Sequence, residues 1–177
     1  MPAHAPRQAL LAGRQGGQAL TALGVTGHQT LPPRVREFVV AAVQGILRQV
    51  EPPLDVITSL AAGADQLVAS ELLRIGGRLH VIVPCRGYER TFAAEEDLAA
   101  FRSLLERAHD VTRLDHAEPS EEAFLAAGES VVDNCEMVIA VWDGEPARGR
   151  GGTADIVRYA RDTGKAVRIV WPEDVAR

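Results

Sequence analysis

Short apolar runs alternate with segments of helical periodicity along nearly the whole chain, and this alternation limits the possible folds more than any other feature. In the intervening segments apolar residues recur at i, i+3, i+4 and i+7, which is typical of amphipathic helices. Strands that alternate with helices form an open, mostly parallel sheet with right-handed crossovers. The sequence therefore predicts a three-layer, Rossmann-like α/β fold of five to six strands with helices on both faces. The predicted strands are residues 19–25, 54–58, 79–83, 111–114, 137–141 and 166–170.

The predicted helices carry start and stop signals at their ends. Pro33 precedes an apolar stripe that runs from Val35 to Val50, and proline is favoured in a first helical turn. Gly76 closes the next helix. A third helix is predicted over 93–108 and a last one ends at 163–164. Between these two, Ser120 followed by two glutamates is typical of a helix N-cap, since the helix dipole favours acids there.

Length and composition favour one ordinary domain. The chain has 177 residues, of which 46% are hydrophobic, and we expect a mobile tail over 1–18 followed by a single nucleotide-binding domain over 19–177. No apolar run approaches the ~20 residues of a membrane span, so we expect a cytoplasmic protein without a membrane partner. Cys85 and Cys135 do not form a C-x-x-C pair, and the histidines lack metal-ligand spacing. We therefore expect no disulfide scaffold, no metal and no other cofactor.

Charge and aromatic content argue against a nucleic-acid binder. The net charge is −5 and aromatic residues make up 5% of the chain. Neutralising phosphates requires a basic face, and binding single strands requires aromatic side chains for stacking. We therefore expect no nucleic-acid partner.

Ligands of such sheets bind at the carboxyl ends of the strands, where the strand order reverses. The strongest signal there is the segment Gly149, Gly151, Gly152 and Thr153, which directly precedes the last helix. Main-chain N–H groups at a helix start attract anions, and glycines let a phosphate approach the backbone. This segment predicts a phosphate-binding loop; the alternative is a flexible surface loop in which Thr153 merely caps the helix.

Two further loops at this edge are rich in small residues. The first, G-V-T-G-H over 24–28, lacks the G-x-G-x-x-G dinucleotide fingerprint. Thr26, Gly27 and His28 are ligand-binding candidates there, although a tight turn explains Gly27 equally well and His28 can instead cap the turn. In the second loop Ser59 and the amides near Gly63 are candidates. Asp65, in the first helical turn, is explained by the helix dipole alone.

Acidic and aromatic residues supply the remaining candidates. Asp133 is predicted near the C-terminal end of its helix, where a carboxylate is disfavoured. Trp142 and Asp143 follow the buried strand 137–141 and place an aromatic plane and a carboxylate at the same edge. Trp142 either stacks on a base or plugs the end of the sheet. Secondary candidates to line the same edge are Arg86 and Tyr88.

Five segments stand in order along the chain: 24–28 (G-V-T-G-H), 59–65 (S-L-A-A-G-A-D), 132–135 (V-D-N-C), 140–144 (A-V-W-D-G) and 151–154 (G-G-T-A). Together they resemble the SLOG superfamily of Rossmann-like domains, which is related to Lonely Guy phosphoribohydrolases, the DNA-processing protein A core and TIR-associated nucleotide sensors. The resemblance implies a nucleotide or nucleotide-derived ligand held by the glycine loops.

The enzymatic branch of that superfamily fits this chain less well than the binding branch. Lonely Guy enzymes carry P-G-G-x-G-T-x-x-E, whereas Ile156 stands three positions after Thr153 here. Asp155 lies one residue earlier, and one residue turns a helical side chain by ~100°. The helix over 120–134 also contains no basic residue.

Three functions remain open from the sequence. The first is a sensor-type domain that binds a nucleotide or a nucleotide derivative. The second is a hydrolase of N-glycosidic bonds in nucleoside monophosphates, with Asp133, Asp143 or Asp155 as the catalytic acid, base or nucleophile. The third is a structural oligomerisation domain, in which small, alanine-rich helices pack against a second copy; a homo-oligomer is compatible with the first two functions as well.

Overall fold

The computed structural model describes residues 21–50, 52–146, 149–173 and 175. The tail expected over 1–18 therefore lies outside the described residues. Within them, six strands form one parallel sheet in the order β4-β3-β2-β1-β5-β6. The strands are β1 (Thr21–Gly27), β2 (Leu54–Thr58), β3 (Arg78–Val83), β4 (Asp110–Arg113), β5 (Met137–Val141) and β6 (Ala166–Ile169).

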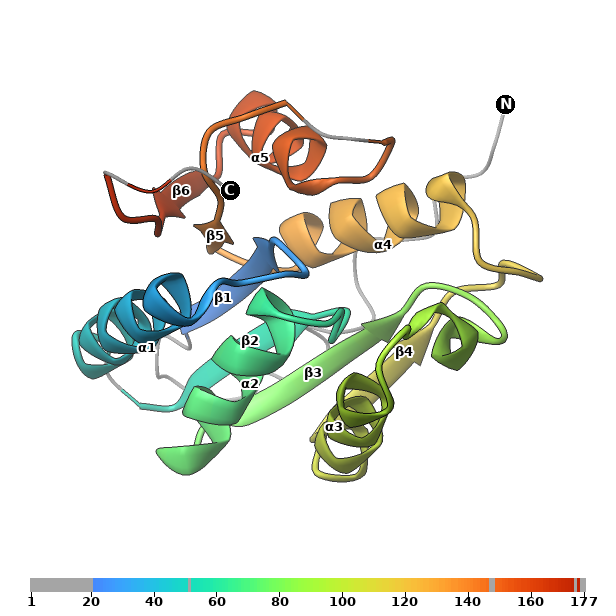
Figure 1. The fold of residues 1–177 in the computed structure, drawn as a ribbon, viewed down its shortest axis with the longest axis horizontal. Helices are drawn as coiled ribbons and strands as arrows, with labels where there is room; N and C mark the ends of the chain where they lie inside the picture. Colours follow the sequence, from blue (N-terminus) through green and yellow to red (C-terminus); the bar gives the residue numbers. More distant parts are fainter. Residues whose placement is uncertain (1–20, 51, 147–148, 174, 176–177) are drawn as a thin grey trace.

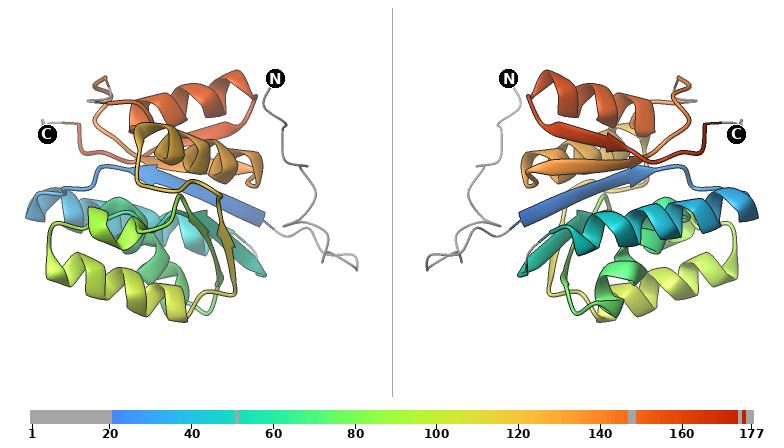
Figure 2. Two further views of the ribbon diagram at one scale, coloured as in Figure 1. Left: turned by 90° about the vertical axis from the view of Figure 1, so that its right-hand side faces the viewer. Right: turned by 90° about the vertical axis from the view of Figure 1, so that its left-hand side faces the viewer.

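Helices cover both faces of the sheet, as the alternation predicted (Figures 1 and 2). On one face lie α1 (Pro33–Arg48), α2 (Ala64–Arg74) and α3 (Glu95–Glu106); on the other lie α4 (Glu121–Asp133) and α5 (Thr153–Asp162). A short 3-10 helix, η1 (Tyr88–Thr91), follows β3 and was not predicted. The Rossmann-like, three-layer α/β architecture is thus confirmed.

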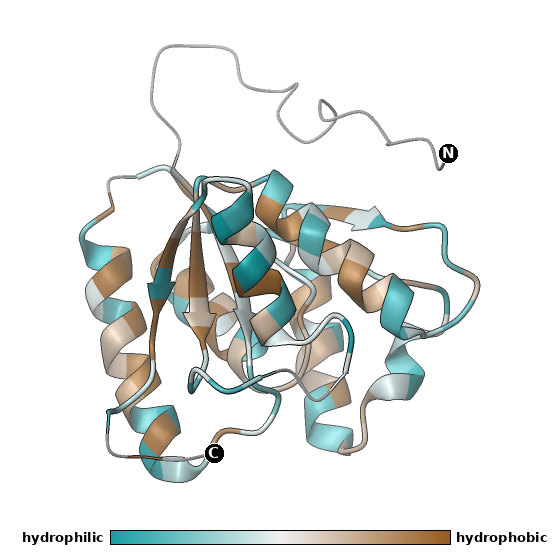
Figure 3. Cartoon of the chain, turned by 90° about the horizontal axis from the view of Figure 1, so that it is seen from above, coloured by the Kyte–Doolittle hydropathy of each residue, from teal (hydrophilic) through white to brown (hydrophobic). Residues whose placement is uncertain are grey.

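Two apolar cores hold the three layers together. The larger lies between the sheet and the helices α1 to α3, and the smaller between the sheet and the pair α4 and α5. In Figure 3 the central strands are coloured mostly as hydrophobic, while the helices alternate between hydrophobic and hydrophilic stripes. β2 is buried along its whole length, and so is β5 after its first residue. This is expected for parallel strands covered on both faces.

Local signals placed most element boundaries correctly. Pro33 is the first residue of α1. The hydroxyl of Ser120 accepts a hydrogen bond from the N–H of Ala123, so Ser120 is the predicted N-cap of α4. β1 extends two residues beyond its predicted end to Gly27, because Gly27 and His28 continue the pairing with β5 at its carboxyl end; its predicted first residues, 19 and 20, lie outside the described residues.

The strand order reverses at β1, which pairs with β2 on one side and with β5 on the other. Gly27 lies opposite Val141, so the carboxyl ends of β1 and β5 meet at the same edge of the sheet. The loops that follow β1, β2 and β5 all leave from this carboxyl edge. The search for a functional site therefore begins there.

No helix among the described residues is long and apolar enough to span a lipid bilayer.

Candidate functional site

His28 and Asp143 meet at the point where the strand order reverses. The N–H of His28 donates to the carbonyl oxygen of Val141 at 3.0 Å, and its ring Nε2 lies 3.0 Å from Oδ1 of Asp143. His28 is only 8% exposed. The ring of Trp171, just beyond β6, contacts the His28 ring edge to face with centroids 5.1 Å apart. Three side chains from different loops thus occupy the space beside the ends of β1 and β5.

The same contacts form a tight turn after β5. The main-chain N–H of Asp143 donates to Nε2 of His28 at 3.3 Å, and Oδ1 of Asp143 accepts from the N–H of Glu145 at 3.0 Å. The indole Nε1 of Trp142 donates to the carbonyl oxygen of Glu145 at 2.8 Å. A neutral Nε2 accepts the Asp143 amide, whereas a protonated Nε2 pairs with the carboxylate. Nε2 of His28 therefore contacts both the main chain and the carboxyl group of Asp143.

The glycines of the first two loops serve close packing. A Cβ on Gly27 would lie 2.8 Å from Cβ of Val141 and would also collide with Cβ of Ala64 at the start of α2. Gly63 has φ +79°, and a Cβ there would collide with the main-chain oxygens of His28 and Gln29. These approaches, together with the hydrogen bond from the N–H of Ala64 to the oxygen of His28, join the two loops. Packing alone therefore explains Gly27 and Gly63.

Thr26, the remaining candidate of the first loop, lies inside β1 opposite Ala140 of β5.

Three amides of the loop after β2, those of residues 59 to 61, are engaged by the chain itself. The hydroxyl of Thr58 donates to Oδ2 of Asp65 at 2.7 Å, and the N–H of Leu60 donates to the Thr58 oxygen at 3.0 Å. The N–H groups of Ser59 and Ala61 also donate to the Asp65 carboxyl group. Burial raises the pKa of Asp65 to about 7, although these hydrogen bonds act in the opposite direction. Asp65 thus fills this loop, and the Ser59 amide is not available to a ligand in this arrangement.

The glycine segment before α5 lies against the start of α4. A Cβ on Gly151, whose φ is +80°, would lie 2.7 Å from the main-chain nitrogen of Leu125, and one on Gly149 would lie 2.7 Å from a carboxylate oxygen of Glu121. The N–H of Gly151 donates to Oδ2 of Asp155 at 3.0 Å, while the other carboxylate oxygen of Asp155 pairs with Arg158. Asp155 therefore holds one amide of the predicted phosphate loop.

Three further amides of the same segment lie at the start of α5. Gly152 is the N-cap of α5, and its carbonyl oxygen accepts the N–H groups of Asp155 and Ile156 at 3.0 and 3.3 Å. The N–H groups of Gly152, Thr153 and Ala154 donate no hydrogen bond to any residue that the structure describes. Thr153 is the first helical residue rather than the cap. Adjacent N–H groups at a helix start are an anion-binding arrangement.

Asp133 does not join these residues. It is the last residue of α4, so it lies at the amino edge of the sheet, where β5 begins. Its Oδ1 accepts a hydrogen bond from the hydroxyl of Tyr159 at 3.0 Å, which links α4 to α5. This contact gives Asp133 a role in helix packing, far from the loops at the carboxyl edge.

The secondary candidates after β3 are placed differently from each other. Tyr88 is buried among Phe92, Phe101 and Phe124, and burial raises the pKa of its hydroxyl above its usual range. Arg86 is exposed and pairs with Asp115 at 3.0 Å. Only Arg86 therefore presents its charge to solvent.

Trp171 and the amide of Ala154 were not singled out from the sequence. Trp171 follows a predicted strand as the first residue of a Trp-Pro pair, which marks the strand's end but not a contact with His28. Ala154 carries no functional side chain, and its N–H is identifiable as a donor only once Gly152 is known to be the N-cap of α5.

No protein-family model matches the chain, and no curated protein matches its sequence. Solved structures do match its fold. DNA processing protein A from Streptococcus pneumoniae superposes with a TM-score of 0.61 at 17% identity, over 85% of this chain and 50% of that one. The same protein from Helicobacter pylori gives 0.62 at 14% identity, over 84% and 64%. TM1055, a structural genomics target, gives 0.54 at 16% identity, over 83% and 72%.

These matches confirm the Rossmann-like architecture at the level of the fold. The chain spans only 50% and 64% of the two DNA processing proteins. One expectation is contradicted: the exclusion of nucleic acid as a partner. The Helicobacter pylori protein, which has this fold, has a single-stranded DNA binding mode. The exclusion failed because net charge sums over the whole surface and does not report the charge or the amide donors at one edge of a sheet.

Proposed function

We propose that this chain, a Rossmann-like domain of the SLOG type in its fold, binds a nucleotide or a nucleotide derivative at the carboxyl edge of the sheet, with a phosphate on the first turn of α5. The observation that carries the proposal is the set of three adjacent N–H groups, of Gly152, Thr153 and Ala154, without a partner among the described residues. They lie at the positive end of the α5 dipole.

The neighbouring contacts support a small anion-binding site at this position. Asp155 takes the N–H of Gly151, so the donors left to an external phosphate begin at Gly152. The hydroxyl of Thr153 adds one further donor in the same turn. The residues from Gly151 to Asp155 are half-buried, which strengthens hydrogen bonds to a charged group relative to full exposure.

The acidic residues support binding rather than turnover. Asp143 is held by His28 and by the turn to Glu145, and Asp155 by Gly151 and Arg158. Asp133 lies at the opposite edge. A pair of carboxyl groups set for hydrolysis of a glycosidic bond requires both to face one substrate. These contacts commit each of the three carboxylates elsewhere, so we favour a sensor-type binding domain.

A second candidate ligand is single-stranded DNA at the same edge. The observation in its favour is the shared fold with the DNA processing proteins, one of which has a single-stranded DNA binding mode. A phosphate within a DNA strand presents the same oxygens to the first turn of α5 as a nucleotide phosphate does. Exposed Arg86 adds a cation at this edge.

Titration calorimetry with AMP, adenosine and a short oligothymidylate tests the proposal. We expect AMP to bind more tightly than adenosine, which lacks the phosphate. Thr153→Pro removes one of the three N–H donors together with the Thr153 hydroxyl, and it keeps the helix start, because proline is favoured at the first helical position and Gly152 is already extended. We expect it to weaken AMP binding by about tenfold, the value of one hydrogen bond to a charged group.

Two controls accompany this variant. Thr153→Ala removes the hydroxyl but keeps the amide, so it separates the two donors. Glu95→Pro introduces the same change at the first residue of α3, where the N-cap Ala94 is also extended, and should leave binding unchanged. Equal affinity for AMP and adenosine, or equal loss in both proline variants, would contradict the phosphate site. Oligothymidylate that competes with AMP and loses affinity in Thr153→Pro would favour the DNA ligand.

A further inference from the structure

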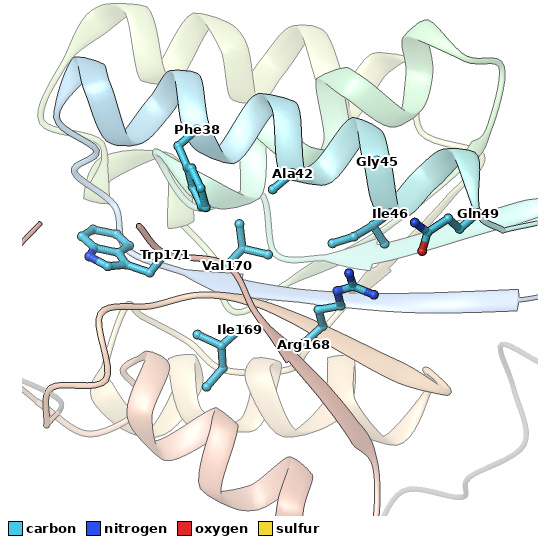
Figure 4. A pocket seen from close by; sticks show the side chains of 9 residues that line it. All are labelled: Phe38, Ala42, Gly45, Ile46, Gln49, Arg168, Ile169, Val170 and Trp171. Atoms are coloured by element: carbon cyan, nitrogen blue, oxygen red, sulfur yellow. The ribbon is translucent and has the colours of Figure 1, made fainter. Parts of the chain in front are cut away.

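A groove of about 380 Å³ runs between α1 and the β6 edge of the sheet (Figure 4). Its α1 wall is formed by Phe38, Ala42, Gly45, Ile46 and Gln49, and its other wall by Arg168, Val170 and Trp171. The Ile169 side chain points away from the groove. The floor is apolar and already buried, since Ile46 and Val170 are each 4% exposed.

An exposed aromatic ring and an open position at Gly45, here called the hollow, both lie on the α1 wall. Phe38 is 43% exposed, which makes it one of the few exposed large apolar side chains in the described part of the chain. Seven residues later, a Cβ on Gly45 would meet nothing within 4 Å. The residue between them that lines the groove is Ala42, whose side chain is small. Seven residues span ~10 Å along a helix, so the ring and the hollow lie about two turns apart.

The charged side chains are also arranged with opposite signs at the two ends of this wall. Glu37 adjoins the Phe38 end, whereas Arg48 and Arg168 lie at the Gly45 end, and all three side chains are exposed. None of the three forms an ion pair with another residue that the structure describes. Arg34, at the start of α1, is exposed as well.

We propose that this face binds a second copy of the chain, with the two α1 helices antiparallel about a two-fold axis near Ala41 and Ala42. In that arrangement the Phe38 ring of each copy enters the hollow at Gly45 of the other. A two-fold interface requires one surface to carry both halves of each contact, which this surface does. The axis also brings Glu37 of one copy to Arg48 of the other, twice. Arg34 then faces the C-terminal carbonyls of the opposite α1, where the helix dipole favours a cation.

Sedimentation of the full chain over a range of concentrations tests this inference independently of the nucleotide site. We expect a dimer, and we expect Gly45→Leu to raise its dissociation constant at least about tenfold by filling the hollow. This variant keeps the fold, because the added side chain has open space and leucine suits a helix better than glycine. Phe38→Ala should weaken the dimer similarly. Ile75→Ala, at an apolar residue 48% exposed at the end of α2, is the matched control and should not.

Charge exchange and cross-linking test the orientation. Arg48→Glu should weaken the dimer by placing like charges together, and the double variant Glu37→Arg with Arg48→Glu should restore it. Ala41→Cys should give a disulfide-linked dimer on mild oxidation, since the two native cysteines are buried. A wild-type chain that stays monomeric at about 100 µM would overturn the proposal. So would a dimer that neither Gly45→Leu nor Phe38→Ala weakens, or one that the double exchange fails to restore.

Discussion

The loops that precede α2 and α5 resemble each other in sequence and differ in what they leave free. Each ends in small residues, has a glycine as N-cap and carries an aspartate in the first helical turn. Before α2, Asp65 is buried and accepts hydrogen bonds from Thr58, Ser59 and Ala61. Before α5, the half-buried Asp155 accepts only one loop amide, that of Gly151. The aspartate therefore holds three donors in one loop and one in the other, where the N–H groups of Gly152, Thr153 and Ala154 have no partner among the described residues.

The position of the aspartate explains the difference. Asp65 is the second residue of α2, whereas Asp155 is the third residue of α5. One residue rotates a side chain by ~100° about the helix axis. At α2 this rotation turns the carboxyl group inward beneath its loop, toward the hydroxyl at the end of β2. Glycine content alone therefore does not decide whether a loop of this kind binds an anion.

The largest expected effect is the loss of the Asp65 carboxyl group. Asp65→Ala would leave the buried Thr58 hydroxyl and the N–H groups of the half-buried Ser59 and Ala61 without an acceptor. Each unsatisfied buried group costs ~1–3 kcal/mol, so we expect the free energy of unfolding to fall by about 3 kcal/mol at pH 6. Urea denaturation measures it. If the free energy of unfolding fell by less than about 1 kcal/mol, Asp65 would not hold its loop more strongly than Asp155 holds the loop before α5.

The next effect is a dependence of stability on pH. Because the pKa of Asp65 is raised to about 7 in the folded chain, the folded state favours its protonated form. The stability that this proton confers is fully present below the unfolded-state pKa and is lost as pH rises through the folded pKa. Between pH 8 and pH 5 we expect the wild type to gain about 2 kcal/mol relative to Asp65→Asn, whose amide does not titrate. Parallel stability curves for the two proteins would contradict the assignment.

A smaller effect is expected at Asp155. Asp155→Ala removes the acceptor of the Gly151 amide and the partner of Arg158, both in a partly exposed site. The free energy of unfolding should fall by about 1 kcal/mol or less. Nucleotide binding should instead tighten a few-fold, because a competing negative charge leaves the α5 start. Calorimetry with AMP measures this gain, and weaker binding would mean that Asp155 orients the ligand rather than competes with it.

The smallest effect is expected at the Ser59 side chain. The main-chain N–H of Ser59 is held by Asp65, and the proposed phosphate site lies at the start of α5 instead. Ser59→Ala should therefore change the affinity for AMP by less than about twofold. The matched variant Thr153→Ala, in the other loop, should change it more. A larger loss of AMP affinity in Ser59→Ala than in Thr153→Ala would contradict the account and place the phosphate at the loop after β2.

The sequence predicted those parts of the fold that depend on local signals. β2 and β5 have the predicted bounds, and Pro33 and Ser120 mark the starts of α1 and α4. Each of these depends on apolar periodicity or on a capping residue within the segment itself. The alternation of strands and helices then allowed few sheet topologies, because crossover connections between parallel strands are almost always right-handed.

The candidate site was less predictable because its contacts join distant segments. Trp171 reaches His28 across more than half of the chain, and His28 reaches Asp143 between different strands. No local pattern indicates which carboxyl group fills its own loop, since that depends on the packing of Asp65 beneath residues 59–61. The placement of Asp133 at the amino edge follows only from the length of α4.

The most direct test of the central claim is a titration of the isotopically labelled chain with AMP, followed by the amide resonances of the two loops. We expect the N–H signals of Gly152, Thr153 and Ala154 to shift with AMP but not with adenosine, while those of Ser59, Leu60 and Ala61 stay in place. Shifts centred on residues 59–61, or no shift at Gly152 to Ala154 at saturating AMP, would contradict the claim that the start of α5 holds the phosphate.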